Sequence, residues 1–110
     1  MLPLVIRIKD AEAQPPMEKQ YVFTQSPVRI GRNQLNDIPI NRAFVSLFHA
    51  LVRFDQRSIS VVDLGSTNGT VLRSPDGESA PLAPHQDTLL PPGSVLTLAD
   101  VVTCSFEVGE

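Results

Sequence analysis

The amino-acid sequence predicts an all-β fold, a sandwich of mostly antiparallel strands. Short runs rich in β-branched and other apolar residues recur along the chain, and turn-forming residues separate them. No long stretch has the three- and four-residue spacing of apolar residues that marks an amphipathic helix. Many short strands at these intervals are typical of a β-sandwich.

Nine segments have the composition of strands. The alternation is clearest between Ser58 and Leu64, where Ile59, Val61 and Asp63 share one face and the residues between them share the other. The nine expected strands are Leu2–Ile8, Gln20–Thr24, Val28–Gly31, Asp37–Ile40, Phe48–Asp55, Ser58–Asp63, Thr70–Arg73, Ser94–Leu98 and Val101–Val108.

Proline and turn residues mark the connections between these strands. Proline lacks a backbone N–H, so most of the prolines are expected in loops. Pro39 is the exception, because it lies inside an expected strand, which should therefore be short or at a sheet edge. Asp55-Gln56-Arg57 and Pro75-Asp76-Gly77 are each expected to turn the chain in a hairpin. The prolines expected in loops are Pro15, Pro16, Pro75, Pro81, Pro84, Pro91 and Pro92.

Length and composition limit the kind of protein. A chain of 110 residues suffices for one hydrophobic core, so residues 1–110 are expected to form a single domain. No apolar run approaches the roughly 20 residues that a transmembrane helix needs, and the apolar start at Met1–Arg7 is interpreted as a strand rather than a signal peptide. The formal charge of −3, with nine scattered basic residues, argues against a nucleic-acid partner.

The only cysteine, Cys104, lies in an alternating segment, where it is expected to pack in the core rather than to react. His49, His85 and Cys104 lack the paired spacing of structural zinc sites, so neither a metal nor another cofactor is expected. Because one cysteine can form no internal disulfide, the cytoplasm, or a cytoplasmic portion of a larger protein, is the expected compartment.

The sequence also contains the residue types of an enzyme active site. Ser46, His49 and Asp63 supply the residue types of a nucleophilic triad. However, a serine nucleophile is expected on a constrained turn beside oxyanion donors, and no glycine lies near Ser46 in the sequence. The sequence therefore does not favour an enzyme.

Three short segments carry more information together than separately: Gly31-Arg32, Val45–Ala50 and Asp63–Thr70. A glycine-arginine pair, a serine and a histidine three residues apart, and the run Asp-Leu-Gly-Ser-Thr-Asn-Gly-Thr, in this order and spacing, resemble the pattern of the forkhead-associated (FHA) domain family. The resemblance covers a motif core at Val28–Val71, and the flanking strands up to Val108 are compatible with the eleven-stranded sandwich of that family.

The resemblance implies a binding module without catalytic activity. Its partner would be a phosphothreonine-containing protein or peptide, held by loops at one end of the sandwich. Such domains are commonly parts of larger signalling proteins, and bacterial relatives often work beside Ser/Thr kinases or within secretion machinery.

The resemblance also implies roles for individual residues. Arg32 would bind the phosphate through its planar fork of donors, and Ser46 would donate its hydroxyl to another oxygen. Thr67 would line the pocket for the threonine methyl group, and Asn68 would hold the peptide backbone. The residues with an architectural role would be Gly31, His49 and Gly69.

Leu47 departs from the family pattern, because a polar or basic residue that contributes to phosphate binding usually follows the serine. Arg42 could substitute for the absent cation. Phe44, Leu47 or Phe48 could instead form an apolar patch that favours a hydrophobic residue a few positions after the phosphothreonine, with Phe44 the best candidate. The alternative is an FHA scaffold that has lost phosphate recognition and mediates phosphorylation-independent protein interaction.

Overall fold

The computed structural model describes residues 3–108, which form eleven strands and no helix. This part of the chain therefore has no helix that could cross a membrane. The strands are β1 (Leu4–Asp10), β2 (Met17–Phe23), β3 (Val28–Gly31), β4 (Ile38–Pro39), β5 (Ala50–Phe54), β6 (Ile59–Asp63), β7 (Thr70–Arg73), β8 (Ser79–Pro81), β9 (Thr88–Leu89), β10 (Val95–Leu98) and β11 (Val102–Val108).

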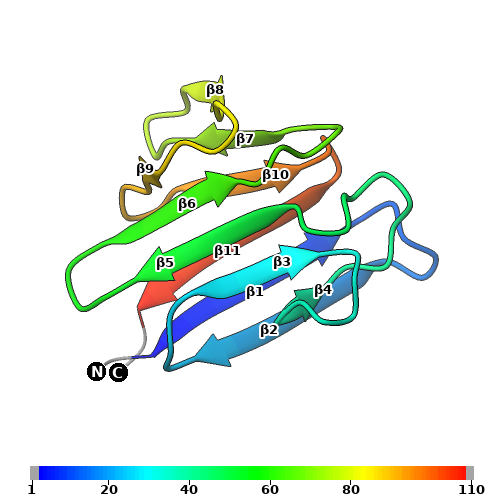
Figure 1. Ribbon diagram of the computed structural model, residues 1–110, viewed down its shortest axis with the longest axis horizontal. Helices are drawn as coiled ribbons and strands as arrows, with labels where there is room; N and C mark the ends of the chain where they lie inside the picture. Colours follow the sequence, from blue (N-terminus) through cyan, green and yellow to red (C-terminus); the bar gives the residue numbers. More distant parts are fainter. Residues whose placement is uncertain (1–2, 109–110) are drawn as a thin grey trace.

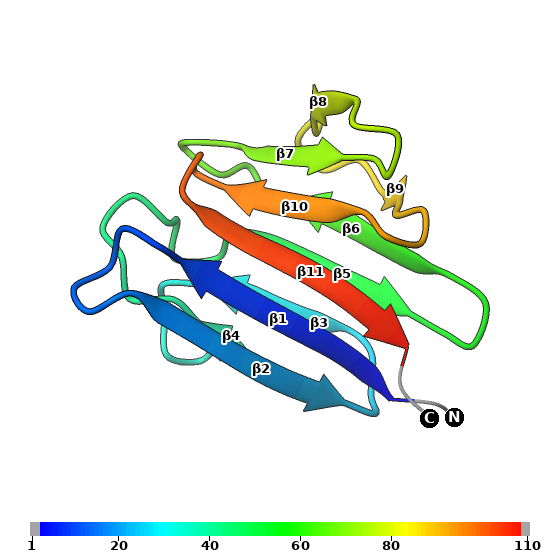
Figure 2. The ribbon, with the colours of Figure 1, turned by 180° about the vertical axis from the view of Figure 1, so that it is seen from behind.

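The strands form two sheets that lie face to face (Figure 1; Figure 2 gives the view from behind). One sheet has six strands in the order β2-β1-β11-β10-β7-β8, and the other has five in the order β4-β3-β5-β6-β9. Neighbouring strands are antiparallel except β3 and β4, which pair in parallel. The predicted all-β, mostly antiparallel sandwich is confirmed.

The hydrophobic core lies between the two sheets, and the alternation of the strands creates it. Along β1, Leu4, Ile6 and Ile8 are buried in the core cluster, whereas Arg7 and Lys9, on the opposite face of the strand, are exposed. The inner faces of β3, β5 and β10 are apolar and buried in the same way. This packing holds the ends of the strands, and hence the loops that leave them, in fixed positions.

All nine expected strands exist, but most of their ends differ from the prediction. Only β3 and β7 have the predicted bounds, and the predicted start at Leu2 lies outside the described residues. Two strands were missed, β8 and β9, because they are short, largely exposed and lack an alternating apolar pattern. Pro81 is not in a loop as expected: it ends β8, which lies at a sheet edge where the missing N–H leaves no neighbouring strand unpaired. Pro39 lies in the two-residue edge strand β4, as predicted.

The two predicted hairpin turns are confirmed. Between β5 and β6, the N–H of Asp55 donates to the carbonyl of Ser58 at 3.0 Å, and the Asp55 carboxylate accepts the N–H groups of Arg57 and Ser58. Between β7 and β8, the N–H of Ser74 donates to the carbonyl of Glu78 at 2.8 Å.

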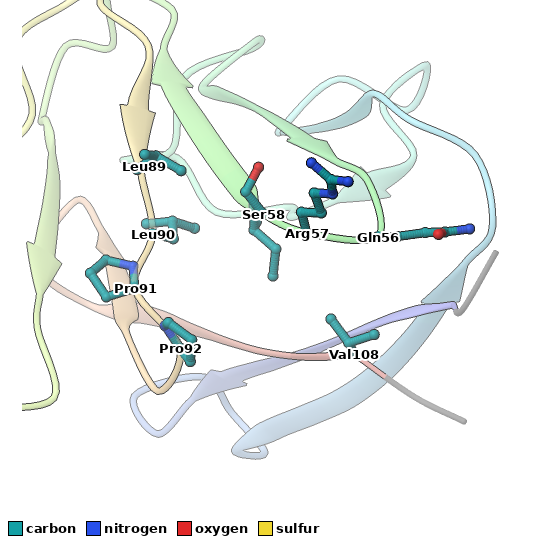
Figure 3. A pocket seen from close by; sticks show the side chains of 9 residues that line it. Gln56, Arg57, Ser58, Leu89, Leu90, Pro91, Pro92 and Val108 are labelled. Atoms are coloured by element: carbon teal, nitrogen blue, oxygen red, sulfur yellow. The ribbon is translucent and has the colours of Figure 1, made fainter.

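The two ends of the sandwich differ in chemistry. The connections β3–β4, β4–β5 and β6–β7 leave the sheets at one end (Figure 1), and they contain the segments singled out in the sequence. At the other end, beside the β5–β6 turn, lies a hollow of about 320 Å³ (Figure 3). Its walls are mainly apolar and include Ile59, Leu89, Leu90, Pro91, Pro92 and Val108. Polar recognition is therefore expected at the first end.

Cys104 is fully buried in β11, as predicted, and this burial raises the pKa of its thiol to about 12. Because thiolate is the reactive form, we expect the folded protein to react with a disulfide reagent at about pH 8 at least roughly a thousandfold more slowly than the denatured chain. Absorbance of the released thiolate measures both rates. Rapid stoichiometric labelling of the folded protein would contradict this burial.

Candidate functional site

Hydrogen bonds join the three connections at one end of the sandwich, β3–β4, β4–β5 and β6–β7. The backbone N–H of Arg32 donates to the carbonyl of Ser46 at 2.9 Å, and the N–H of Thr67 donates to Ser46 Oγ at 3.0 Å. Nδ2 of Asn68 donates to the carbonyl of Phe44 at 2.8 Å. The four polar residues expected to contact a ligand therefore lie together, around the segment that contains Ser46.

Arg32 is half-buried, and its guanidinium is held on one side only. Nε donates to the carbonyl of Val45 at 3.0 Å. The two terminal nitrogens have no hydrogen bond or ion pair within residues 3–108, so their donors are available to an anion. A guanidinium in this state offers the fork geometry that fits two phosphate oxygens.

Ser46 has its acceptor side occupied and its donor side available. Its Oγ accepts the N–H of Thr67, and the hydroxyl donates to no group among the described residues. The hydroxyl proton is therefore available to a ligand oxygen. The amide of Asn68 is partly used by the protein, because one of its N–H groups donates to Phe44.

His49 lies beneath these loops and is fully buried. Its Nδ1 accepts the N–H of Ser46 at 3.1 Å, so the proton of the neutral ring is on Nε2, which lies 3.0 Å from the carbonyl of Gly69. The ring thus ties the β4–β5 connection to the β6–β7 connection. Since both ring nitrogens are engaged with backbone groups, His49 does not act on Ser46 Oγ, and the triad considered from the sequence is not formed. Gly69 has a φ of +85°, a conformation that favours glycine.

Asp63, at the end of β6, organises the β6–β7 connection. Its side chain accepts hydrogen bonds from the hydroxyls of Ser66 and Thr70, both at 2.6 Å, and from the N–H groups of Gly65 and Ser66. Burial alone would raise the pKa of Asp63, but the hydrogen bonds from Ser66 and Thr70 outweigh it and hold the pKa below its usual value. The carboxylate is therefore ionised near neutral pH and fixes the loop that carries Thr67.

Gly31 allows the β3–β4 and β4–β5 connections to approach closely. A Cβ atom at Gly31 would lie 2.4 Å from the carbonyl oxygen of Leu47 and 2.9 Å from Nδ2 of Asn36. Asn36 is a buried residue that the sequence analysis missed, and its Nδ2 donates to the carbonyls of Asn33 and Leu47 at 2.7 and 2.8 Å. One asparagine in a polar loop gives no periodic signal, so nothing in the sequence identified it.

The side chains of Leu47 and Phe48 are 47% and 45% exposed. Neither side chain is buried in the core, because β5 begins only at Ala50, and the buried residues of this segment are Val45 and His49. Leu47 and Phe48 therefore present apolar surface within two residues of Ser46.

Arg42 is held within the protein at one end of its guanidinium. Nη1 forms an ion pair with the buried carboxylate of Asp10, and the guanidinium carbon lies 4.6 Å from the centroid of the Phe44 ring. In Arg32, by contrast, both terminal nitrogens have no partner among residues 3–108.

The lowered pKa of Asp63 makes part of the stability dependent on pH. A depressed carboxyl pKa contributes stability above the unfolded-state value of about 3.9, and this contribution disappears as the pH falls through the folded-state value. We expect Asp63→Asn to lower the free energy of unfolding by about 2 kcal/mol at pH 7 and by clearly less near pH 3, measured by urea denaturation. Asp76→Asn, in the exposed β7–β8 turn, is the matched control and should change it by less than about 0.5 kcal/mol. An equal loss for Asp63→Asn at both pH values would contradict the assignment.

Comparison with solved structures supports the architecture. The FHA domain of an Arabidopsis thaliana hypothetical protein is 25% identical, with a TM-score of 0.79, and the match covers 100% of this chain and 88% of that one. An FHA domain from a structural and functional study of phosphothreonine-dependent interactions is 23% identical, with a TM-score of 0.72 and 98% of each chain covered. Mycobacterium tuberculosis EmbR, in complex with a low affinity phosphopeptide, is 24% identical with a TM-score of 0.69, over 96% of this chain and 24% of EmbR.

Sequence comparison identifies the family. No curated protein sequence matches the chain significantly. The family model of the FHA domain matches residues 28–99, which is more than half of the chain and includes all three segments singled out above. The chain therefore belongs to the FHA domain family.

Proposed function

We propose that this protein binds a phosphothreonine-containing segment of a partner protein, with Arg32 and Ser46 on the phosphate, Thr67 beside the threonine methyl group and Asn68 on the peptide backbone. FHA domains are interaction modules that recognise phosphothreonine peptides. The observation that carries the proposal is that Arg32 is hydrogen-bonded to the Val45 and Ser46 carbonyls while its terminal nitrogens, like the Ser46 hydroxyl proton, have no partner among residues 3–108.

The chemistry of this pair fits a phosphoryl group. A phosphothreonine carries a charge of about −1.5 to −2 near neutral pH and three strong acceptor oxygens. Two guanidinium donors and one hydroxyl can satisfy these oxygens, whereas an unmodified threonine offers the pair no anion. Binding would thus depend on a Ser/Thr kinase and would serve signalling or assembly, in the cytoplasm or in a cytoplasmic portion of a larger protein.

Leu47 favours a second candidate, a scaffold that binds its partner without phosphate. The side chain that follows Ser46 is apolar and half-exposed, and Arg42 is paired with Asp10, so the phosphate would meet one cation instead of two. A charge-assisted hydrogen bond is worth about 1.5 to 3 kcal/mol, so affinity for the phosphate would be about ten- to a hundredfold lower than with a second cation.

Titration of one phosphothreonine peptide and its unphosphorylated twin separates the two candidates. We expect the phosphorylated peptide to bind at least about tenfold more tightly, and Arg32→Ala or Ser46→Ala to remove about ten- to a hundredfold of its affinity, measured by calorimetry. Arg29→Ala is the matched control, because this exposed β3 arginine lies outside the loop cluster. Equal affinities for the two peptides would refute phosphate recognition and support the scaffold.

Proteins retained from a lysate by the wild type and not by Arg32→Ala would identify partners.

Phe44 is proposed to read the peptide beyond the phosphothreonine. Its carbonyl is held by Asn68, its half-buried ring packs against the core, and the exposed Leu47 follows three residues later. We expect a degenerate phosphothreonine library to select a hydrophobic residue a few positions after the phosphothreonine, and Phe44→Ala to lose this preference. Selection of acidic residues alone at those positions would discard the hypothesis.

A further inference from the structure

A buried carboxylate supports the binding loops from the opposite sheet. Asp10 ends β1, and its side chain is fully buried. Its Oδ1 accepts the N–H groups of Glu12 and Ala13, both at 3.1 Å, so it also fixes the start of the β1–β2 connection. Its Oδ2 accepts a hydrogen bond from Arg42, in the β4–β5 connection. Both ribbon views place these two connections side by side (Figures 1 and 2).

Arg42 links this carboxylate to the aromatic residue of the loop cluster. One end of its guanidinium is bound to Asp10, and its carbon lies 4.6 Å from the centroid of the Phe44 ring, within the range of a cation–π contact. The carbonyl of Arg42 also accepts the N–H of Val45 at 3.0 Å, which closes a tight turn around Phe44. The guanidinium is thus fixed on one side by Asp10 and lies with its carbon over the Phe44 ring.

We propose that Asp10 and Arg42 are positioning residues that hold the Phe44 ring at the edge of the binding loops and so set the selectivity for the peptide residue that contacts it. This inference rests on the proposed phosphothreonine binding. The role assigned to Arg42 is orientation and not phosphate binding, because one end of its guanidinium is bound to Asp10 and its planar face lies over the Phe44 ring.

The stability of the folded protein does not require the ion pair between Asp10 and Arg42. Removing two charges from water costs free energy that their attraction often fails to recover, and an apolar pair of similar volume can be as stable. What Asp10 and Arg42 supply, and an apolar pair would not, is a flat cation at a fixed place under the ring. Lysine in place of Arg42 would keep the charge but lack the planar fork that can meet a carboxylate and an aromatic face together.

A double-mutant cycle tests this inference. Affinities are measured for two phosphothreonine peptides that differ only at the residue selected in the library, one with the preferred hydrophobic residue and one with alanine there. The proteins are the wild type, Arg42→Gln, Phe44→Ala and the double variant. We expect the wild type to prefer the first peptide about three- to tenfold, each single variant to lose this preference, and the double variant to lose no more than either single one.

Two further variants sharpen the result. Arg42→Lys should also lose the preference, because it keeps the charge without the flat surface. Arg7→Gln is the matched control: it breaks the exposed ion pair with Glu107, 2.8 Å long, and should leave both affinities unchanged. The inference is overturned if Arg42→Gln weakens both peptides equally, if the losses add in the double variant, or if Arg42→Lys retains the full preference.

A measurement without ligand separates this inference from the proposed function. Asp10→Asn keeps a carbonyl oxygen for the N–H groups of Glu12 and Ala13 but removes the charge that fixes Arg42. In NMR spectra we expect this variant to remain folded while the Arg42 Nε–H signal loses the ring-current shift caused by Phe44. If the wild type binds no phosphothreonine peptide, the proposed function fails, yet a lost shift still supports the positioning of Phe44. An unchanged Arg42 signal in folded Asp10→Asn would refute the positioning whatever the peptide affinities are.

Discussion

Four consecutive backbone carbonyl groups, from Phe44 to Leu47, lie outside the strands and pair with no neighbouring strand. The arrangement of the loops at this end of the sandwich depends on the groups that donate hydrogen bonds to them. Backbone carbonyls in partly buried loops need hydrogen-bond donors. The neighbouring loops supply them: Asn68 to Phe44, Arg32 to Val45 and Ser46, and the 33–36 turn to Leu47. The residues that build the loops are therefore largely the residues proposed to bind the ligand.

This double use explains why the site is pre-organised. Arg32 donates hydrogen bonds from Nε and its backbone N–H to the β4–β5 connection, and its terminal nitrogens remain available to an anion. Ser46 Oγ accepts a hydrogen bond from the N–H of Thr67, and its hydroxyl proton remains available to a ligand. Little side-chain entropy remains to be lost on binding, which favours affinity. Beneath, His49 and Asp63 hold the two connections through hydrogen bonds to backbone groups and to the hydroxyls of Ser66 and Thr70. The side chains beneath the loops thus fix the positions of Ser46 and Thr67.

Structural features that depend on a local pattern of residues were predicted from the sequence. Features that depend on contacts between residues distant in the sequence were missed. The nine alternating segments predicted nine strands, but β8 and β9 carry no such pattern, because each is mostly exposed and only two or three residues long. The convergence of Arg32 and Ser46 was implied by the resemblance to the FHA family, and hydrogen bonds do join the two segments. By contrast, the pair of Asp10 and Arg42 joins residues 32 positions apart, and its burial is visible only in the folded chain.

The engagement of Arg42 also bears on what kind of binder this domain is. In the proposed complex, a cation paired with a buried carboxylate would add little field at the phosphate, so the electrostatic contribution to affinity would rest mainly on Arg32. In exchange, Phe44 is held in a defined orientation, and Leu47 and Phe48 present apolar surface close by. Apolar contacts discriminate by shape and are insensitive to salt, whereas exposed charge contacts are screened. Relative to a site with two phosphate-binding cations, this arrangement would, in the proposed complex, move recognition from the phosphate toward the residues that flank it.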